Sequence, residues 1–171
     1  MNETDLILEV VERGSLFSPF SARECTQSLT PIPQDSLRRT INGVLVCVGN
    51  KGHHKFQSTI SCKDKAPPAF ENLWVGTHLK VGCLQSLTQT IPAGASRIFL
   101  EREPLRCYAY DPLEKMWPIE KVEGNSVFLS PGCPGGFITY RPWLRMVVKH
   151  YHLETDEWEA SVGWRLELEE E

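Results

Sequence analysis

The C-terminal segment of the chain alternates strictly between apolar and polar residues. The apolar positions are Trp158, Ala160, Val162, Trp164, Leu166 and Leu168. This period of two is that of a half-buried β-strand, in which successive side chains point to opposite faces of the sheet. A strand with two tryptophans on one face must pack against a second layer. We therefore expect this segment to close the core of an all-β protein.

Short apolar or alternating segments recur upstream, separated by glycine- and proline-containing turns. The predicted strands are 44–48, 56–62, 79–83, 98–100, 105–110, 127–129, 137–140 and 143–152. Turn signals every 8 to 12 residues are typical of an antiparallel β-sandwich or barrel. Segments 44–48 and 56–62 flank a glycine-rich turn, and we predict that they pair as a hairpin. Segments 143–152 and 158–168 are predicted to form a C-terminal hairpin.

Three segments near the N-terminus have a less regular pattern. Residues 6–11 fit either a first strand or the start of a helix. Residues 13–40 carry prolines and serines at turn spacing, which predicts a long extended arm that contacts a neighbouring subunit. The Asn42-Gly43 pair lies just before the strand at 44–48, so it indicates either a bend or bulge, or a hairpin turn.

Length, charge and hydrophobicity limit the number of domains and the kinds of partner that the protein can have. The 171 residues suit one domain, 1–171, and 12 glycines and 12 prolines supply its many turns. The net charge of −4 disfavours a protein whose main task is to grip a phosphate backbone, although a duplex can still pass it unbound. The chain has no apolar run of transmembrane length and no basic signal-peptide start, so we expect a cytoplasmic protein without membrane insertion.

The six cysteines do not form a recognisable metal site. They are Cys25, Cys47, Cys62, Cys83, Cys107 and Cys133, with no Cys-x-x-Cys pair among them. Zinc sites usually take cysteine ligands two by two from tight turns. Four of these residues fall within predicted strands, where a thiol behaves as a small hydrophobic side chain. We expect free thiols, because a reducing compartment disfavours disulfides.

Other candidate chemistry is sparse. His150 and His152 lie two apart on one strand face and could bind a metal with His78 or a carboxylate, but spacing places no third ligand. Several carboxylates lie in turns, where such residues ordinarily cap and solvate the backbone; they are Asp111, Glu114, Asp156 and Glu157. Nothing selects one cysteine as a nucleophile. We therefore predict no catalytic residue, no metal and no cofactor.

Seven segments of the chain carry a resemblance to a known group of proteins. They are Pro19-Phe-Ser-Ala-Arg-Glu-Cys-Thr-Gln-Ser-Leu29, Leu37-Arg-Arg-Thr-Ile-Asn-Gly-Val-Leu-Val46, Lys55-Phe-Gln-Ser-Thr-Ile-Ser-Cys62, Pro67-Pro-Ala-Phe70, Leu73-Trp-Val-Gly76, Gly136-Phe-Ile-Thr-Tyr-Arg-Pro-Trp-Leu144 and Thr155-Asp-Glu-Trp-Glu-Ala-Ser-Val-Gly-Trp164. In this order they resemble small tail proteins of tailed bacteriophages and prophages of Gram-negative bacteria. Residues 85–135 match only loosely, which marks them as a more variable hairpin region.

The resemblance implies a structural virion protein, similar to the distal tail proteins of a tail tip or baseplate. It implies a homo-oligomeric ring, with a hexamer favoured, that is assembled in the host cytoplasm. Its partners would be the tail tube, tape-measure and hub proteins, and DNA would pass through without specific binding. A tail terminator or neck connector, and a soluble β-barrel binding domain or small enzyme outside any particle, are the alternatives.

Candidate interface residues follow from the arm and from the matching segments. They are Phe20, Arg23, Leu29, Arg38, Arg39, Tyr140, Arg141, Trp143 and Trp158. The same residue types also serve in turns and cores, so the motif residues have that alternative use.

Overall fold

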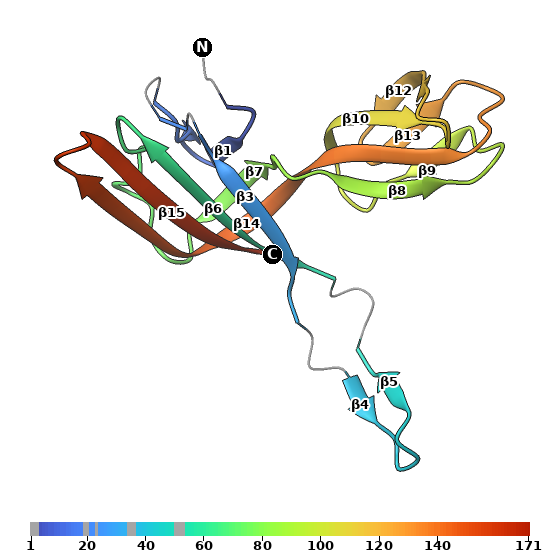
Figure 1. The fold of residues 1–171 in the computed structure, drawn as a ribbon, viewed down its shortest axis with the longest axis horizontal. Helices are drawn as coiled ribbons and strands as arrows, with labels where there is room; N and C mark the ends of the chain where they lie inside the picture. Colours follow the sequence, from blue (N-terminus) through green and yellow to red (C-terminus); the bar gives the residue numbers. More distant parts are fainter. Residues whose placement is uncertain (1–3, 19–20, 23, 34–36, 50–53) are drawn as a thin grey trace.

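The computed structural model describes residues 4–18, 21–22, 24–33, 37–49 and 54–171. Within these residues the chain forms fifteen β-strands and no helix. All strand pairs are antiparallel. The predicted all-β, antiparallel class is therefore confirmed, and the strands pack into two lobes with a separate projecting hairpin (Figure 1).

The first lobe is a sheet in the order β2-β1-β7-β14-β15-β6-β3. Its strands are β1 (Ile7–Val10), β2 (Gly14–Ser15), β3 (Thr26–Pro31), β6 (Phe56–Asp64), β7 (His78–Gly82), β14 (Gly136–Asp156) and β15 (Ser161–Glu170). One face of this sheet buries Leu8, Ile60, Met146 and Leu166. Phe70, from the segment between β6 and β7, covers this core and meets the Trp164 ring edge-on at 5.4 Å.

The second lobe packs two small sheets over their own core. One sheet joins β8 (Leu87–Ile91), β10 (Pro104–Tyr110) and β11 (Met116–Trp117) to the N-terminal part of β14. The other has the order β12-β13-β9, comprising β12 (Ile119–Glu123), β13 (Ser126–Leu129) and β9 (Arg97–Phe99). Ile98, Val127 and Ile138 are buried between the sheets, as in a β-sandwich. The region 85–135 supplies most of this lobe.

Strand β14 belongs to both lobes. It is 21 residues long, whereas ordinary strands have 3 to 10. Residues 136–142 pair with β8 and β10, and residues 143–147 pair with β7. Figure 1 shows β14 running from one lobe into the other. The lobes are thus connected through a continuous strand as well as through the connection between β7 and β8.

A two-stranded hairpin projects from the ends of β3 and β6 (Figure 1). It consists of β4 (Leu37–Arg39) and β5 (Leu45–Cys47), with Arg39 opposite Leu45. Gly43 lies in its turn at φ +78°, a conformation that glycine adopts without strain, and its N–H donates to the Thr40 carbonyl at 2.8 Å. The Asn42-Gly43 pair therefore marks a hairpin turn, the second of the two alternatives that the sequence allowed.

The predicted hairpin between 44–48 and 56–62 is wrong. Strand β5 pairs with β4, whereas β6 pairs with β3 and β15. The Asn-Gly turn brings 37–39 onto 45–47 through a short loop, which costs less entropy than a longer closure. The apolar face of β6 is then free to complete the first core, where Ile60 and Cys62 are buried.

Some of the other local predictions are confirmed and others are wrong. Residues 7–10 form a strand, so the helical alternative for 6–11 is excluded. The C-terminal hairpin is confirmed as β14 and β15, and Trp164, Leu166 and Leu168 are buried. Trp158 is not part of that core, because it lies in the turn with 98% of its surface exposed. Nor is 13–40 simply an arm, since β2 and β3 are the two edge strands of the first-lobe sheet.

Candidate subunit interface

The projecting hairpin, residues 37–49, exposes apolar side chains that have no core of their own. Six of the seventeen exposed large hydrophobic residues in the described ranges lie in this short segment: Leu37, Ile41, Val44, Leu45, Val46 and Val48. Ile41 is fully exposed and Val48 is 69% exposed. An isolated two-stranded hairpin is marginally stable in water, and clustered apolar exposure marks an interaction site. The hairpin is therefore the strongest candidate for contact with another protein chain.

The hairpin also carries positive charge. Arg38 and Arg39 are adjacent on β4, and both are exposed. Arg39 donates from Nη1 to the Gly43 carbonyl at 3.0 Å, which ties β4 to the turn. The surface that the hairpin offers is thus apolar along both strands and basic on β4. A complementary surface would combine apolar groups with carboxylates.

The two strands that flank the hairpin are held together at the ends nearest to it. The Ile32 N–H donates to the Lys55 carbonyl at 2.8 Å, which extends the pairing of β3 with β6 by one residue. Beyond them the Arg102 guanidinium donates to both carboxylate oxygens of Glu170 at 2.9 Å and to the His54 carbonyl at 2.8 Å. The same guanidinium lies 4.7 Å from the centre of the Phe56 ring. This clamp connects β6, β15 and the entrance of the second lobe.

The clamp is electrostatically strong because it is sheltered. The side chains of Arg102 and Glu170 are each only 11% exposed. Burial lowers the pKa of Arg102, but the hydrogen bonds and charge of Glu170, together with smaller contributions from Tyr140 and Glu101, raise that pKa by more. A two-pronged guanidinium–carboxylate pair also fixes the relative orientation of its partners. The pair therefore fixes His54, just before β6, relative to the end of β15.

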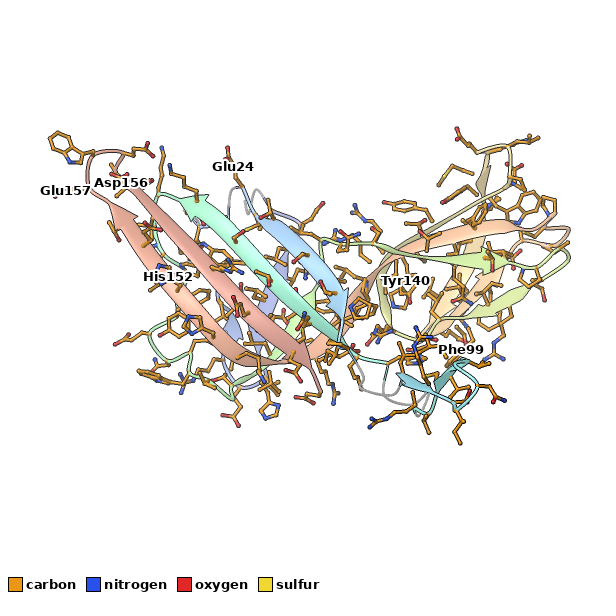
Figure 2. The ribbon with its side chains drawn as sticks, turned by 60° about the horizontal axis from the view of Figure 1, so that its bottom comes forward. Glu24, Phe99, Tyr140, His152, Asp156 and Glu157 are labelled. Atoms are coloured by element: carbon orange, nitrogen blue, oxygen red, sulfur yellow. The ribbon has the colours of Figure 1, made fainter. Side chains whose placement is uncertain are left out.

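A pocket of about 480 Å³ lies beside the clamp, at the waist between the lobes. We call it the waist pocket; it is lined by Phe56, Leu87, Thr88, Gln89, Phe99, Glu101, Arg102 and Tyr140. Phe99 is 65% exposed, and the Glu101 side chain is 74% exposed. Figure 2 shows Phe99 on the second lobe and Tyr140 where β14 passes between the lobes. The pocket thus combines aromatic surface with an exposed carboxylate, the complement of the hairpin.

The structure distributes the candidate interface residues over different environments. Arg38, Arg39 and Trp158 are exposed, the first two on the projecting hairpin and the third at the far tip of the β14–β15 turn. Phe20 and Arg23 lie outside the described residues. The remaining four candidates, Leu29, Tyr140, Arg141 and Trp143, have partners within the chain.

Those four residues serve mainly to pack the body. Tyr140 is only 4% exposed, so it is a core residue rather than a surface one, and burial raises the pKa of its hydroxyl. Leu29 is half-buried against the first core. Arg141 donates from Nε to the Cys83 carbonyl at 2.6 Å, and Lys80 Nζ lies 4.4 Å from the centre of a Trp143 ring. Only Tyr140 among them reaches the waist pocket.

Sequence reasoning missed the apolar hairpin and the clamp for different reasons. The consecutive apolar residues at 44–48 were visible, but a run of this kind is equally typical of a buried strand. Exposure of both faces depends on the hairpin standing away from the body. Arg102 and Glu170 are 68 residues apart, and no local pattern connects them.

The other candidate chemistry is not assembled into a site. Figure 2 shows Asp156 and Glu157 at the tip of the β14–β15 hairpin, with His152 along the same hairpin and far from the waist. His78 is paired with Glu171. In the part of the chain that the structure describes, no group of three or more His, Cys, Asp or Glu side chains is placed to hold a metal ion.

Comparison of the chain with protein-family models, curated proteins and solved structures finds no match. No helix among the described residues has the length and hydrophobicity needed to cross a membrane.

Proposed function

We propose that the chain is a structural subunit of a bacteriophage tail and forms a hexameric ring around the DNA channel at the tail tip or baseplate. The resemblance of seven sequence segments to phage tail proteins motivates the tail assignment. The observation that supports assembly is the projecting hairpin, which exposes apolar residues on both strands. Tail tube, tape-measure and hub proteins would be the neighbours of such a ring.

The hairpin of one copy would seat in the waist pocket of the next. Both surfaces expose apolar side chains, and Arg38 and Arg39 on the hairpin would pair with Glu101 beside the pocket, whose carboxylate also lies 3.3 Å from Arg102 Nη1. Such a contact joins two different surfaces of the same protein. Contacts of this kind generate a ring when the rotation between copies closes, whereas self-complementary contacts stop at a dimer. The two surfaces therefore suit a ring subunit.

Charge is consistent with passage of DNA through such a ring. The chain has 18 Lys and Arg against 22 Asp and Glu, so it has no excess of cations to neutralise phosphates, and affinity for duplex DNA depends mainly on such neutralisation. DNA would thus pass without specific binding. The virion is the proposed destination, after assembly in the host cytoplasm.

Charge reversal tests the proposed contact. Arg38→Glu combined with Arg39→Glu, and separately Glu101→Arg, should each weaken self-association roughly tenfold or more, because like charges then face each other. The variant that carries all three changes should recover association. Light scattering over a concentration series measures this, and Arg145→Glu, on an exposed site of the first lobe, is a matched control. Unchanged association in both reversed variants would reject the hairpin-to-pocket contact.

Virion analysis tests the tail assignment. Mass spectrometry of purified particles should detect the chain, and cryo-electron microscopy should place it in a ring at the tail tip. A position at the neck or the head-proximal end would assign it instead to a connector or terminator. Absence from the particles would reject a virion role and favour a binding domain that acts outside the particle.

A further inference from the structure

Two cysteine sulfurs meet at the edge of the main sheet. Thr26 on β3 lies opposite Ser61 on β6, and continuing this antiparallel register by one residue sets Cys25 opposite Cys62. The Sγ atoms of Cys25 and Cys62 are 3.1 Å apart. Directly opposed residues on antiparallel strands have Cα separations of about 4.5–5.5 Å, which lies within the range that a disulfide spans. The backbone therefore needs no large movement to join the two sulfurs.

The surroundings hold this pair in place. Cys62 is 7% exposed and packs in the first core, whereas Cys25 is half-buried and closer to solvent. The buried carboxylate of Asp64 accepts hydrogen bonds from the Ala22 N–H at 2.6 Å and from Trp164 Nε1 at 2.8 Å. The first bond attaches Ala22 to β6, and the second joins β15 to the same carboxylate. Cys25 is thus the accessible partner and Cys62 the sheltered one.

We propose that Cys25 and Cys62 are an oxidation site, at which a small-molecule disulfide such as glutathione disulfide converts the thiol pair into an intramolecular disulfide. The reaction needs only this oxidant. Cys25 is the attacking group, since it is the more accessible sulfur, and the hydrogen bond with Cys62 lowers the Cys25 pKa, against the opposing effect of burial. That hydrogen bond and burial raise the pKa of Cys62.

The atoms and electrons balance in two exchange steps. The Cys25 thiolate attacks one glutathione sulfur, the glutathione S–S bond breaks, and one glutathione thiolate leaves. That thiolate takes up the proton that Cys25 released on ionising. The Cys62 thiol then loses its proton as its sulfur attacks Cys25 Sγ, the mixed disulfide breaks, and the second glutathione leaves as a thiolate that takes up this proton. The two protein thiols are oxidised to one disulfide, and the oxidant is reduced to two thiols.

The cross-link would close a loop that contains the whole projecting hairpin. Strand β3 leads into the hairpin and β6 leads out of it, so any load on the hairpin acts on the pairing of these two strands. A disulfide at their far end would stop β3 from separating from β6. This mechanical consequence rests on the proposed function, whereas the oxidation itself does not. A reducing cytoplasm would keep the pair open, and release into an oxidising medium would close it.

The test uses the purified full-length chain with excess glutathione disulfide. Intact mass should fall by two hydrogens, two of the six thiols should become resistant to alkylation, and non-reducing peptide mapping should link Cys25 to Cys62. The melting temperature should rise by about 5–10 °C, because the closed loop is long. Dithiothreitol should reverse all three changes.

Cysteine variants identify which two thiols form the cross-link. Cys25→Ser should lose the cross-link, and Cys107→Ser, which removes another half-buried thiol, should retain it. Circular dichroism verifies that the variants are folded. If Cys25→Ser does not fold, Cys62→Ala is used instead and should likewise lose the cross-link. A stable glutathione adduct without ring closure, a disulfide between other cysteines, or full alkylation of both thiols would each overturn the proposal. None of these outcomes bears on the ring contact, because the reaction is measured on the free chain.

Discussion

The guanidinium of Arg102 and the carboxylate of Glu170 form two parallel hydrogen bonds of 2.9 Å where the two lobes meet the base of the projecting hairpin. Arg102 precedes β10 in the second lobe, and Glu170 ends β15 in the first. The backbone N–H of Phe56 donates to the same carboxylate at 2.9 Å. One sheltered ion pair therefore connects both lobes and the first residue of β6 after the hairpin.

Replacing Arg102 with methionine should lower the free energy of unfolding by about 2–4 kcal/mol, because the Glu170 carboxylate then lacks its counter-charge in a sheltered site. Urea unfolding followed by tryptophan fluorescence measures this. Glu101→Gln, which removes an exposed carboxylate beside the same arginine, should change stability by less than about 0.5 kcal/mol. Equal effects of the two substitutions would show that the clamp is not structural.

Gly136 at the start of β14 should not tolerate a side chain. Its φ is +144°, and an added Cβ would lie 2.1 Å from the Tyr110 carbonyl oxygen. Because backbone atoms form this contact, Gly136→Ala should cost at least about 3 kcal/mol or unfold the second lobe. Gly132→Ala, also at positive φ but with nothing within 4 Å, should cost about 1–2 kcal/mol in a thermal melt. A Gly136→Ala protein as stable as Gly132→Ala would contradict this packing.

Polar substitutions on the projecting hairpin should separate assembly from folding. Ile41→Ser with Val44→Ser removes exposed apolar groups, so the stability of the monomer should change by less than about 0.5 kcal/mol. Self-association measured by light scattering should fall, because the proposed contact loses its apolar anchor. Leu8→Ala, in the first core, should instead cost about 2–5 kcal/mol. Undiminished association of the double variant would place the contact elsewhere.

Alkylation of the reduced chain should distinguish two half-buried thiols by pH. The hydrogen bond with Cys62 lowers the pKa of Cys25, whereas burial raises that of Cys107. The thiolate is the reactive form, so the rate for Cys25 should reach its plateau at a lower pH than the rate for Cys107. Peptide mass spectrometry after short pulses of iodoacetamide gives both profiles. Cys62→Ala removes the hydrogen bond and should bring the Cys25 profile closer to that of Cys107. A Cys25 plateau at a higher pH than that of Cys107 would show that the Cys62 hydrogen bond does not stabilise the Cys25 thiolate.

Local pattern was sufficient for the class of fold and for several strands. The alternation that ends in Trp164, Leu166 and Leu168 identified the last strand and its buried face, because a period of two allows a strand to bury one side only. The same pattern wrongly predicted that Trp158 is buried. Trp158 lies in the turn that precedes β15, so its side chain is exposed. Arg38 and Arg39 were predicted to lie in a subunit interface because they belong to the segment 13–40, which was expected to form an extended arm. Both are exposed, and their contact with another subunit stays a prediction.

Pairing between distant segments was decided only in three dimensions. The apolar run at 44–48 is compatible with a core strand, and only its place on a hairpin remote from both cores leaves it exposed. The Arg102–Glu170 clamp and the opposition of Cys25 to Cys62 likewise join residues that no local period relates. Side-chain alternation specifies which face of a strand is buried, whereas the partner of that strand depends on how all the strands together cover two cores.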